Sequence, residues 1–357
     1  MAPLGIARMF PASVLPLLME IPEIEALTRA AFPDWKEAGE FSVEVIDRTG
    51  SGRRFFRLTK EGQVPDSTLF AMHYSLERRE NGRFAEITRF LEEIGVPVPR
   101  ILSADAENHV LWLEDLGAVD LASFQEENWQ TTRAPLYRAA LSAVLPLHRV
   151  GETANAPGLP ELEPPFDAAL YQWEQDYFFE HFAANFSTAA EAELAEARAS
   201  NDLRALVDEL AAEPRALLHR DFQSSNVMIR DGHAYLIDYQ GLRWGVPEYD
   251  LASLLFDPYV ELAAEHREEL ARTYHELRGA GGEGESWDRF RARLDRCACQ
   301  RLMQALGAYG NLGLNKGQPG FLRHIPVAVK RLREIAIDRG AAPSLAPVLS
   351  LRETSVA

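Results

Sequence analysis

The sequence predicts an α+β fold of two lobes, a small β-rich lobe with one main helix followed by a larger and mostly helical lobe. Alternating apolar and polar residues, the pattern of half-buried strands, run through much of residues 41–74. After Leu116 helical periodicity dominates, and one short β insertion at residues 216–241 interrupts it. The chain of 357 residues is long enough to give each lobe its own core. We therefore divide it into residues 1–116 and 117–357.

Three strands open the small lobe in this prediction. FSVEVIDR at 41–48 and RRFFRL at 53–58 are joined by the turn TGSG, and STLFAMHY at 67–74 follows a second turn. The next segment repeats its apolar residues at the spacing of an amphipathic helix, and Gly95 with two following prolines ends it. The stripe consists of Phe84, Ile87, Leu91 and Ile94. Two further strands, around Ile101 and in HVLWLEDL, complete the lobe.

The larger lobe is predicted to be helical over four stretches. The segments 151–165 and 279–286, rich in Gly with Pro or Glu, are typical of surface loops. The helical stretches are residues 136–150, 166–182, 189–210 and most of 258–339. The β insertion lies between the third and the fourth of them.

The first twenty residues show no pattern of regular structure. A basic residue precedes an apolar stretch, but Pro11 and Pro16 interrupt it and no cleavage pattern follows, which disfavours a secretory signal. We expect residues 1–20 to be a flexible leader, or the true start to be Met19. No run of residues reaches the apolar length that a membrane span needs.

Charge and cysteine content disfavour several classes of function. The net charge of −17 argues against nucleic acid and anionic membrane surfaces, because binding their phosphates needs a clustered basic face. Cys297 and Cys299 lie two positions apart on a predicted helix, do not face each other, and are too few for a zinc site of the usual spacing. Two reduced thiols suit the cytoplasm, where we expect the protein to act without an obligate protein partner.

The β insertion carries the strongest chemical signal. An Asp-Gly pair at 231–232, set between two apolar runs, predicts a tight hairpin. Counting back from that turn places Asn226 opposite Ile237, so Asn226 and Asp238 emerge at the same end. The loop that carries Asp221 ends there too. One amide and two carboxylates should therefore converge at this end of the hairpin.

Such a set of groups suits phosphoryl transfer. Mg²⁺ prefers hard oxygen ligands and usually keeps waters, so Asn226 and Asp238 together with ATP phosphates would suit it. A separate carboxylate, Asp221, can orient an acceptor hydroxyl and take its proton. Asp and Asn most often cap turns, and for any one of the three this is the simpler explanation. All three at this spacing, around an Asp-Gly hairpin, favour the chemical role.

The motifs of this insertion are those of a known family. HRDFQSSN at 219–226 and LIDYQG at 236–241 resemble motifs of the aminoglycoside phosphotransferases and choline-type kinases. The resemblance runs over most of the chain and implies a protein-kinase-like bilobal fold, ATP as phosphoryl donor and Mg²⁺ as cofactor. It also implies that Asp221 is the base and that Asn226 and Asp238 hold the metal.

Two further motifs extend the resemblance. LWLEDLG resembles the family's hinge, which implies that backbone groups around Glu114, Asp115 and Leu116 meet adenine. PEYDLASLLFDPYV resembles the family's downstream motif, which implies that Asp250 supports the catalytic loop, and we expect the same of His219.

Three stretches narrow the resemblance to one branch of the family. GLRWGVPEYDLASLLFDPYV, LGAYGNLG and GFLRHIPVAVKRL are similar to the bacterial N-acetylmuramate/N-acetylglucosamine anomeric kinases of cell-wall recycling. This similarity implies transfer of the γ-phosphoryl group of ATP to the C1 hydroxyl of an amino sugar. We expect Gln223, Gln240 and Arg243 to bind that sugar. Arg243, Arg323 and His324 are also candidates for recognising a substrate carboxylate.

The glycine turn of the small lobe is a weaker signal. It would let backbone N–H groups approach phosphates, but it lacks the last glycine of GxGxxG and matches neither a P-loop nor a dinucleotide fingerprint. STLFAMHY also lacks the lysine that kinases carry on the third strand, and Met72 or His73 takes its place, depending on register. Arg53 or Arg54 would then supply the charge. The residues expected to contact nucleotide here are Gly50, Ser51, Gly52, Arg53 and Met72.

Some residues have simpler explanations, and two other functions stay open. His148 is predicted to be a packed histidine. Trp173, Tyr177 and Phe178 are predicted to form core or pocket wall, with a cage for a quaternary amine as the alternative. A kinase for an aminoglycoside, choline or another amino alcohol would suit the acidic composition, whereas the C-terminal motifs favour the amino sugar. A pseudokinase module would explain the missing lysine, but the intact Asp221 motif argues against it.

Overall fold

The chain forms two compact units. The computed structural model describes residues 19–36, 41–46, 53–60, 67–152, 156–279 and 284–352. The first unit consists of residues 1–85 and 100–115, and the second of residues 86–99 and 116–357. Helix α4 (Phe84–Glu93) therefore begins in the first unit and continues in the second.

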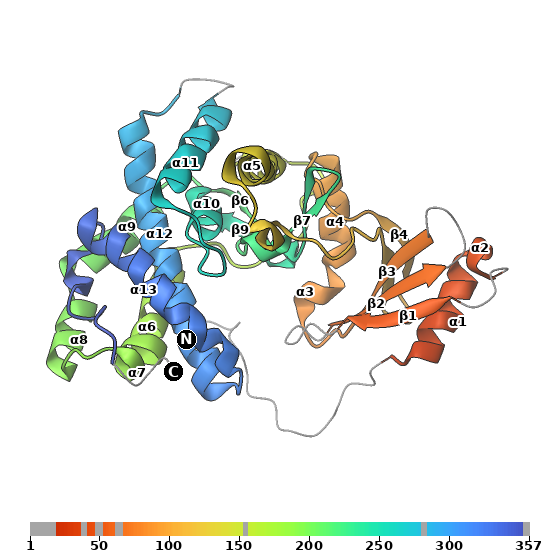
Figure 1. The fold of residues 1–357 in the computed structure, drawn as a ribbon, viewed down its shortest axis with the longest axis horizontal. Coiled ribbons are helices and arrows are strands. Elements are labelled where there is room, and N and C mark those ends of the chain that lie inside the picture. The colour runs from red at the N-terminus through yellow and green to blue at the C-terminus, as the bar shows by residue number, and fades with distance from the viewer. Residues whose placement is uncertain are drawn as a thin grey trace. The chain divides into compact units, whose positions relative to one another are not determined.

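An antiparallel sheet of five strands, in the order β1-β2-β3-β5-β4, forms the first unit (Figure 1). Its strands are β1 (Ser42–Ile46), β2 (Arg53–Lys60), β3 (Ser67–Tyr74), β4 (Ile101–Asp105) and β5 (Val110–Leu113). All five predicted strands are present, so the β-rich first lobe of the predicted α+β fold is confirmed. Phe56 and Leu58 are fully buried while Arg57 between them is half-buried, as expected for a sheet with one packed face.

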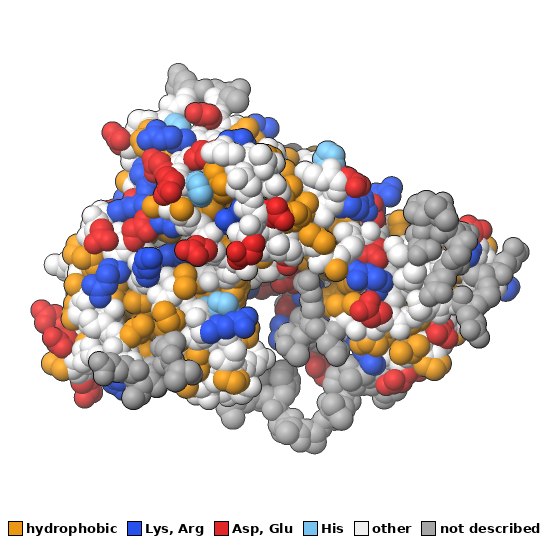
Figure 2. All heavy atoms as spheres, in the orientation of Figure 1, with side chains coloured by type: hydrophobic (Ala, Val, Ile, Leu, Met, Phe, Trp, Pro, Cys, Tyr) orange, Lys and Arg blue, Asp and Glu red, His pale blue; other side chains and the backbone are white. Residues whose placement is uncertain are grey.

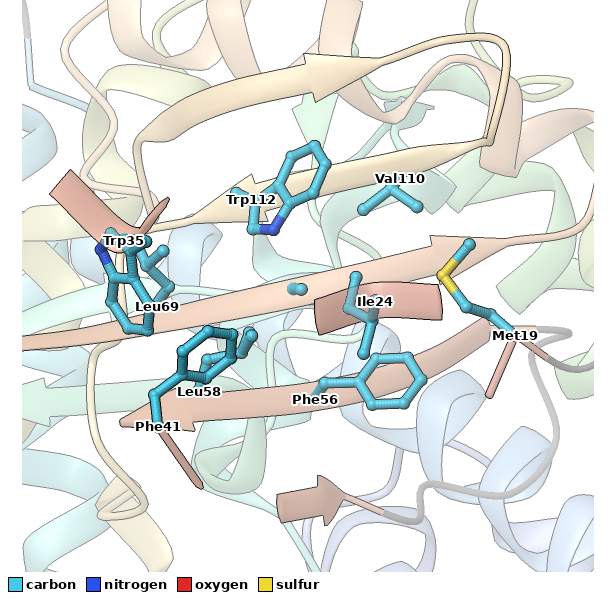
Figure 3. Packing of buried hydrophobic residues seen from close by; sticks show 10 residues of the cluster. Met19, Ile24, Trp35, Phe41, Phe56, Leu58, Leu69, Val110 and Trp112 are labelled. Carbon is cyan, nitrogen blue, oxygen red and sulfur yellow. The ribbon is translucent and has the colours of Figure 1, made fainter. Parts of the chain in front are cut away.

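The core of the first unit lies between one face of this sheet and helix α1 (Ile21–Ala31). Figure 3 shows Ile24 of α1 close to Phe56 and the other apolar side chains of this core. The Trp112 indole N–H donates a 2.9 Å hydrogen bond to the buried Thr28 hydroxyl, which ties the sheet to the helix.

Helix α1 and the short helix α2 (Pro33–Lys36) are absent from the sequence prediction. A start signal was nevertheless present, because Pro22 lies in the first turn and the Glu20 N–H donates a 2.8 Å hydrogen bond to the Glu23 carboxylate. The predicted helix α4 is confirmed and is preceded by α3 (Arg79–Gly82).

A long helix, α12 (Trp287–Gly310), organises the second unit (Figure 1). It packs against α6 (Ala168–Phe178), α10 (Glu248–Leu255) and α13 (Ile325–Arg333). Helix α10 lies in the PEYDLASLLF motif and is not among the predicted helical stretches.

Two glycines of α12 allow a close approach to the α6 region. A Cβ atom on Gly307 would lie 2.7 Å from the Tyr177 ring, and one on Gly310 would overlap the His181 carbonyl group. Gly307 and Gly310 of LGAYGNLG are therefore a packing requirement of this close approach.

The remaining helices agree with the predicted stretches, with two exceptions. The segment 189–210 is divided at Ser200 into two helices, and the short α7 lies between two predicted stretches. They are α5 (Ala134–His148), α7 (Ala184–Phe186), α8 (Glu191–Arg198), α9 (Asn201–Ala212) and α11 (Ala264–Gly279). Short π-helical turns are Trp129–Arg133, Phe179–Ala183, Asn311–Asn315 and Glu334–Asp338. Short 3₁₀ turns are Leu121–Phe124, Ser224–Asn226, Tyr239–Gly241, Pro319–His324 and Pro343–Leu345.

Two short antiparallel ladders carry the β insertion. Strand β6 (Ala216–Leu218) pairs with β9 (Arg243–Gly245), and β7 (Val227–Arg230) pairs with β8 (His233–Leu236). The β7–β8 hairpin matches the prediction, and the β6–β9 ladder adds to it.

The surface charges, the two cysteines and the helix lengths can be compared with the functions that the sequence disfavours. Acidic and basic side chains are interspersed on the face drawn in Figure 2. Cys297 and Cys299 are both buried and free, and burial raises the pKa of both thiols. None of the helices in the described ranges has the length and apolarity that crossing a membrane requires.

Candidate active site

The hairpin of β7 and β8 forms in the predicted register. Its turn residues 231–232 have the positive φ angles, 53° and 76°, of a tight hairpin turn. At the open end the Ile237 N–H donates a 3.0 Å hydrogen bond to the Asn226 carbonyl oxygen. Because Asp238 is the next residue, it emerges beside Asn226.

The loop between β6 and β7 brings Asp221 to the same end of the hairpin. The Asn226 side-chain nitrogen and the Gln223 N–H both donate to the Asp221 carbonyl oxygen, each at 2.9 Å. The Ser224 N–H donates to the buried Asp257 carboxylate at 2.9 Å and anchors the loop. Local hydrogen bonds therefore hold the predicted base and the predicted metal ligands in one short stretch of backbone.

Asn226 and Asp238 carry the oxygen atoms that a hard cation prefers. Since the Asn226 amide nitrogen is bonded to Asp221, the amide oxygen is the atom left for a ligand. Asp238 has φ 64°, and its Oδ1 accepts a 2.8 Å hydrogen bond from Gln240. Within the described ranges no three His, Cys, Asp or Glu side chains gather as a metal cluster, so this pair would hold a cation only together with phosphate oxygens or water.

The fully buried Asp250 carboxylate holds the loop on its other side. It accepts hydrogen bonds from the N–H groups of His219 at 2.6 Å and Arg220 at 2.8 Å. It also lies 3.0 Å from His148 Nε2, and His148 Nδ1 lies 2.6 Å from the Tyr274 hydroxyl. Arg220 has φ 77°, so this network maintains a left-handed conformation that few non-glycine residues adopt. His148 is packed as predicted, and it is also part of this network.

The Asp221 carboxylate lies between two arginines. Its Oδ2 is 3.5 Å from Arg220 Nη1, and its Oδ1 is 3.7 Å from Arg301 Nη2. Burial alone would raise the pKa of Asp221, but the nearby positive charges, first Arg220 and then Arg301, lower it below its usual value. Because 36% of the side chain remains exposed, an ionised carboxylate is accessible to a ligand.

Arg301 and Glu174 are site residues that the sequence prediction missed. The Arg301 Nε donates a 3.0 Å hydrogen bond to the Ser253 hydroxyl. Glu174 is buried and accepts hydrogen bonds from the Tyr249 hydroxyl at 2.8 Å and from Gln300 at 2.9 Å, and burial raises its pKa. Both lie on helices far from the hairpin in sequence, where one charged residue gives no signal of its own.

The three residues predicted to bind the sugar, Gln223, Gln240 and Arg243, differ from one another in their contacts. Gln240 is bonded to Asp238, and the half-buried Gln223 contributes its backbone to the loop. The Arg243 guanidinium lies 5.3 Å from the Phe166 ring centre, and its charge is among those that lower the Asp221 pKa. Sugar binding by these three residues stays a prediction.

The other aromatic and cationic candidates lie on α6 and on the 3₁₀ turn before α13. Trp173 and Tyr177 stack with ring centres 5.0 Å apart. Arg323 Nε lies 3.2 Å from His324 Nε2, and the His324 ring meets Tyr259 edge-on at 4.5 Å.

The residues predicted to bind nucleotide belong to the first unit, apart from the buried Leu116. Gly50, Ser51 and Gly52 lie outside the described residues. Arg53 begins β2 and its guanidinium lies 5.8 Å from the Phe55 ring centre.

The strand register places Met72 and His73, the two candidates for the position of the lysine, on opposite faces of the sheet. Met72 is fully buried and pairs with Phe55 and Leu111, whereas its neighbour Ala71 faces the α1 core. Since side chains alternate along a strand, Met72 lies on the sheet face opposite α1 and His73 on the α1 face.

The acidic side chains at the end of β5 are engaged within the first unit. Asp115 accepts hydrogen bonds from Arg57 Nε at 2.9 Å and Nη2 at 3.2 Å, and Glu114 accepts one from Arg100 Nε at 3.1 Å. Any adenine contact would therefore use backbone groups, as the hinge resemblance implies.

Comparison with protein families gives one match over most of the chain. The model described as the phosphotransferase enzyme family matches residues 42–293. This range contains the whole sheet of the first unit and the β7–β8 hairpin.

Three curated bacterial proteins named N-acetylmuramate/N-acetylglucosamine kinase are similar to the chain. That of Neisseria meningitidis is 25% identical over 302 residues, 83% of this chain and 86% of the relative. That of Pseudomonas aeruginosa is 26% identical over 313 residues, 85% of this chain and 88% of the relative. That of Pseudomonas putida is 24% identical over 318 residues, 87% of this chain and 88% of the relative.

Solved structures share the fold. A choline kinase from Cryptosporidium parvum has a TM-score of 0.58 at 15% identity, covering 91% of this chain and 98% of its own. A choline/ethanolamine kinase family protein from Mesorhizobium loti has a TM-score of 0.58 at 19% identity, covering 92% and 98%. At such identities the likeness shows the fold, and it confirms the predicted kinase-like architecture. The chain therefore belongs to the phosphotransferase enzyme family, and it is a phosphotransferase that acts on a hydroxyl group.

Proposed function

We propose that this protein is an ATP-dependent kinase that phosphorylates the anomeric C1 hydroxyl of N-acetylmuramate and N-acetylglucosamine, in the cytoplasm, as a step of peptidoglycan recycling. The observation that carries the proposal is the gathering of Asp221, Asn226 and Asp238 at one end of the hairpin. The names of the three bacterial relatives support the choice of acceptor.

Asp221 is the residue that would orient and deprotonate the acceptor. Its lowered pKa keeps the carboxylate ionised at neutral pH, and its exposed oxygens can accept a hydrogen bond from a hydroxyl group. An anomeric hydroxyl is more acidic than an ordinary alcohol, so a weakly basic carboxylate suffices. Positioning of the hydroxyl in line with the phosphoryl group carries most of the rate.

Asn226 and Asp238 would hold the divalent cation, which we expect to be Mg²⁺. Such an ion supplies positive charge to the phosphates of ATP during transfer. A structural neighbour is described as an amicoumacin kinase in complex with AMP-PNP and Ca²⁺, which supports a nucleotide with a divalent cation in this fold.

The test is a product assay. The protein is incubated with Mg²⁺-ATP and a panel of reducing sugars, aminoglycosides and choline, and the products are examined by phosphorus NMR. A sugar 1-phosphate formed from N-acetylmuramate or N-acetylglucosamine is the expected result. Phosphorylation at C6, of an aminoglycoside or of choline would overturn the proposal.

A further inference from the structure

Two guanidinium groups lie beside Asp221 in the second unit, and the charge of a third acts on the same carboxylate. Arg220 and Arg301 lie 3.5 and 3.7 Å from the two Asp221 oxygens. The Arg243 charge acts on the same carboxylate and on Arg220. They come from three separate elements, namely the catalytic loop, α12 and β9. In a chain with a net charge of −17, this concentration of positive charge at one point requires a reason.

Few negative charges lie around these arginines. Asp221 is the carboxylate beside both Arg220 and Arg301, and the charge of Glu163 acts on Arg243. Glu174, the other carboxylate whose charge acts on Arg220 and Arg301, is bonded to a tyrosine and a glutamine, and burial raises its pKa. The free site is therefore short of negative charge beside the base.

The arginines also keep donor capacity for a ligand. A guanidinium has five N–H donors. Arg301 donates from Nε to Ser253 and from Nη1 to Gln304, while Nη2 faces Asp221 at a distance longer than a hydrogen bond. The Arg220 side chain is 41% exposed and its Nη1 likewise stands off Asp221.

The strained backbone conformation of Arg220 also favours a role for this residue in binding a ligand. Its left-handed φ of 77° is maintained by the buried Asp250, and its side chain packs against Gly241, where an added Cβ would lie 3.5 Å from Arg220 Cδ. Such a conformation is costly for a non-glycine residue and tends to occur where function requires it.

We infer that the acceptor carries a carboxylate, which Arg301 and Arg220, with Arg243, bind beside the reacting hydroxyl. This inference rests on the proposed kinase function and deepens it. It favours the acidic sugar N-acetylmuramate over the neutral N-acetylglucosamine, and it disfavours cationic acceptors. Arg301 is the specificity residue, since its Nε bond to Ser253 fixes the guanidinium in place.

The test compares acceptors that differ only in charge. Initial rates are measured with N-acetylmuramate, with its neutral carboxamide analogue and with N-acetylglucosamine. The wild type should prefer the carboxylate by roughly 10-fold or more in kcat/KM, because a hydrogen bond to a charged group is worth about that much in affinity. Arg301→Gln should lose this preference, and Arg301→Lys should keep part of it. Arg289→Gln, a substitution of a 66% exposed arginine on the same helix, is the control.

Equal loss of rate on charged and neutral acceptors in Arg301→Gln would overturn the inference, since the arginine would then act on the transferring phosphoryl group or on Asp221. Anion binding is measured separately, by calorimetric titration with sulfate in the presence of saturating Mg²⁺-ADP. We expect binding to wild type and about 10-fold weaker binding to Arg301→Gln. If no sugar is phosphorylated but this difference is found, the proposed function fails and the anion site stands. Equal sulfate binding by the two proteins contradicts the anion site.

Discussion

Four carboxylates lie around the catalytic hairpin, and their neighbours decide what each can do. Asp250 accepts hydrogen bonds from two backbone N–H groups and contacts a histidine, so it anchors the loop that carries Asp221. Asp257 is bonded to Ser224 and fixes the loop. Asp238 follows the hairpin beside an amide oxygen, and Asp221 faces guanidinium groups with part of its surface open.

Substitution of Asp221 by Asn should lower kcat by about 10²- to 10⁴-fold, which is the usual range for a general base, with little change in the KM for ATP. The variant keeps the shape of the side chain and the backbone bonds of the loop. Coupled measurement of ADP release checks this, with thermal unfolding as the control for folding. A variant with full turnover would show that Asp221 is not the base.

The pH profile follows from the lowered pKa of Asp221. As the proposed base, Asp221 would act in its ionised form, so kcat/KM should stay level through neutral pH and fall only as the pH drops through a pKa below the usual 3.8 of an aspartate. Arg220→Gln removes one of the charges that lower this pKa, so its acid limb should move to higher pH. An unchanged acid limb in this variant would contradict the pairing of Arg220 with Asp221.

Removal of the metal should stop the reaction. EDTA is expected to abolish transfer and added Mg²⁺ to restore it. Asp238→Asn should raise the Mg²⁺ concentration for half-maximal rate by about 10-fold or more. A charged ligand contributes at least as much binding affinity as one hydrogen bond to a charged group. Asp231→Asn, at the other end of the same hairpin and at a positive φ that Asn tolerates, should leave the requirement unchanged. Equal Mg²⁺ requirements in the two variants would argue against a metal at Asp238.

At the scale of elements, the β7–β8 hairpin is formed by residues that are close together in the sequence. The residues that anchor its loop come from helices that are distant in the sequence. The Asp-Gly turn and the β7–β8 register involve only the neighbouring residues 227–236, and both were predicted correctly. The anchors of the loop come from α5 and α10, and Arg301 comes from α12. The packing of these helices therefore determines the position of Asp221.

The glycines of α12 provide a test of this helix packing. Gly310→Ala should destabilise the protein by about 1–3 kcal/mol or more, because a methyl group would overlap the His181 carbonyl and force the helices apart. Gly279→Ala, at the end of α11 where nothing lies within 4 Å, should be neutral or stabilising by about 0.5–1 kcal/mol. Urea denaturation of the two variants measures the contrast, and equal stabilities would contradict the close approach.

At the scale of the whole molecule, each unit has its own core, and a buried ion network adds to that of the second. Arg293 of α12 donates to both oxygens of the fully buried Glu248 at 2.8 and 2.9 Å. Glu285 and Arg278 extend the network to the neighbouring segments. Burial alone would raise the pKa of Glu248, but Arg293 lowers it.

This network should make stability depend on acid pH. A carboxylate whose folded pKa is depressed stabilises the protein above its unfolded pKa, near 4.5, and the contribution is lost as the pH falls through the folded pKa. Arg293→Met should cost about 3–5 kcal/mol at pH 7, because it leaves Glu248 buried and unpaired, and the difference from wild type should shrink towards pH 4. Urea denaturation at several pH values measures this, with Arg198→Gln, which breaks the exposed Arg198–Asp176 pair outside the network, as control. A constant difference at all pH values would contradict the role of Glu248.

The sequence by itself determined the five strands of the first unit, helix α4, most helical stretches of the second unit, and the grouping of Asp221, Asn226 and Asp238. These features depend on periodicity, turn chemistry and short-range pairing, which neighbouring residues encode. Only the tertiary structure decided that Met72 and not His73 faces away from α1, that His148 supports Asp250, and that Arg301 lies beside Asp221. Those contacts join residues up to about a hundred positions apart, and such pairings leave no periodic trace in a single chain.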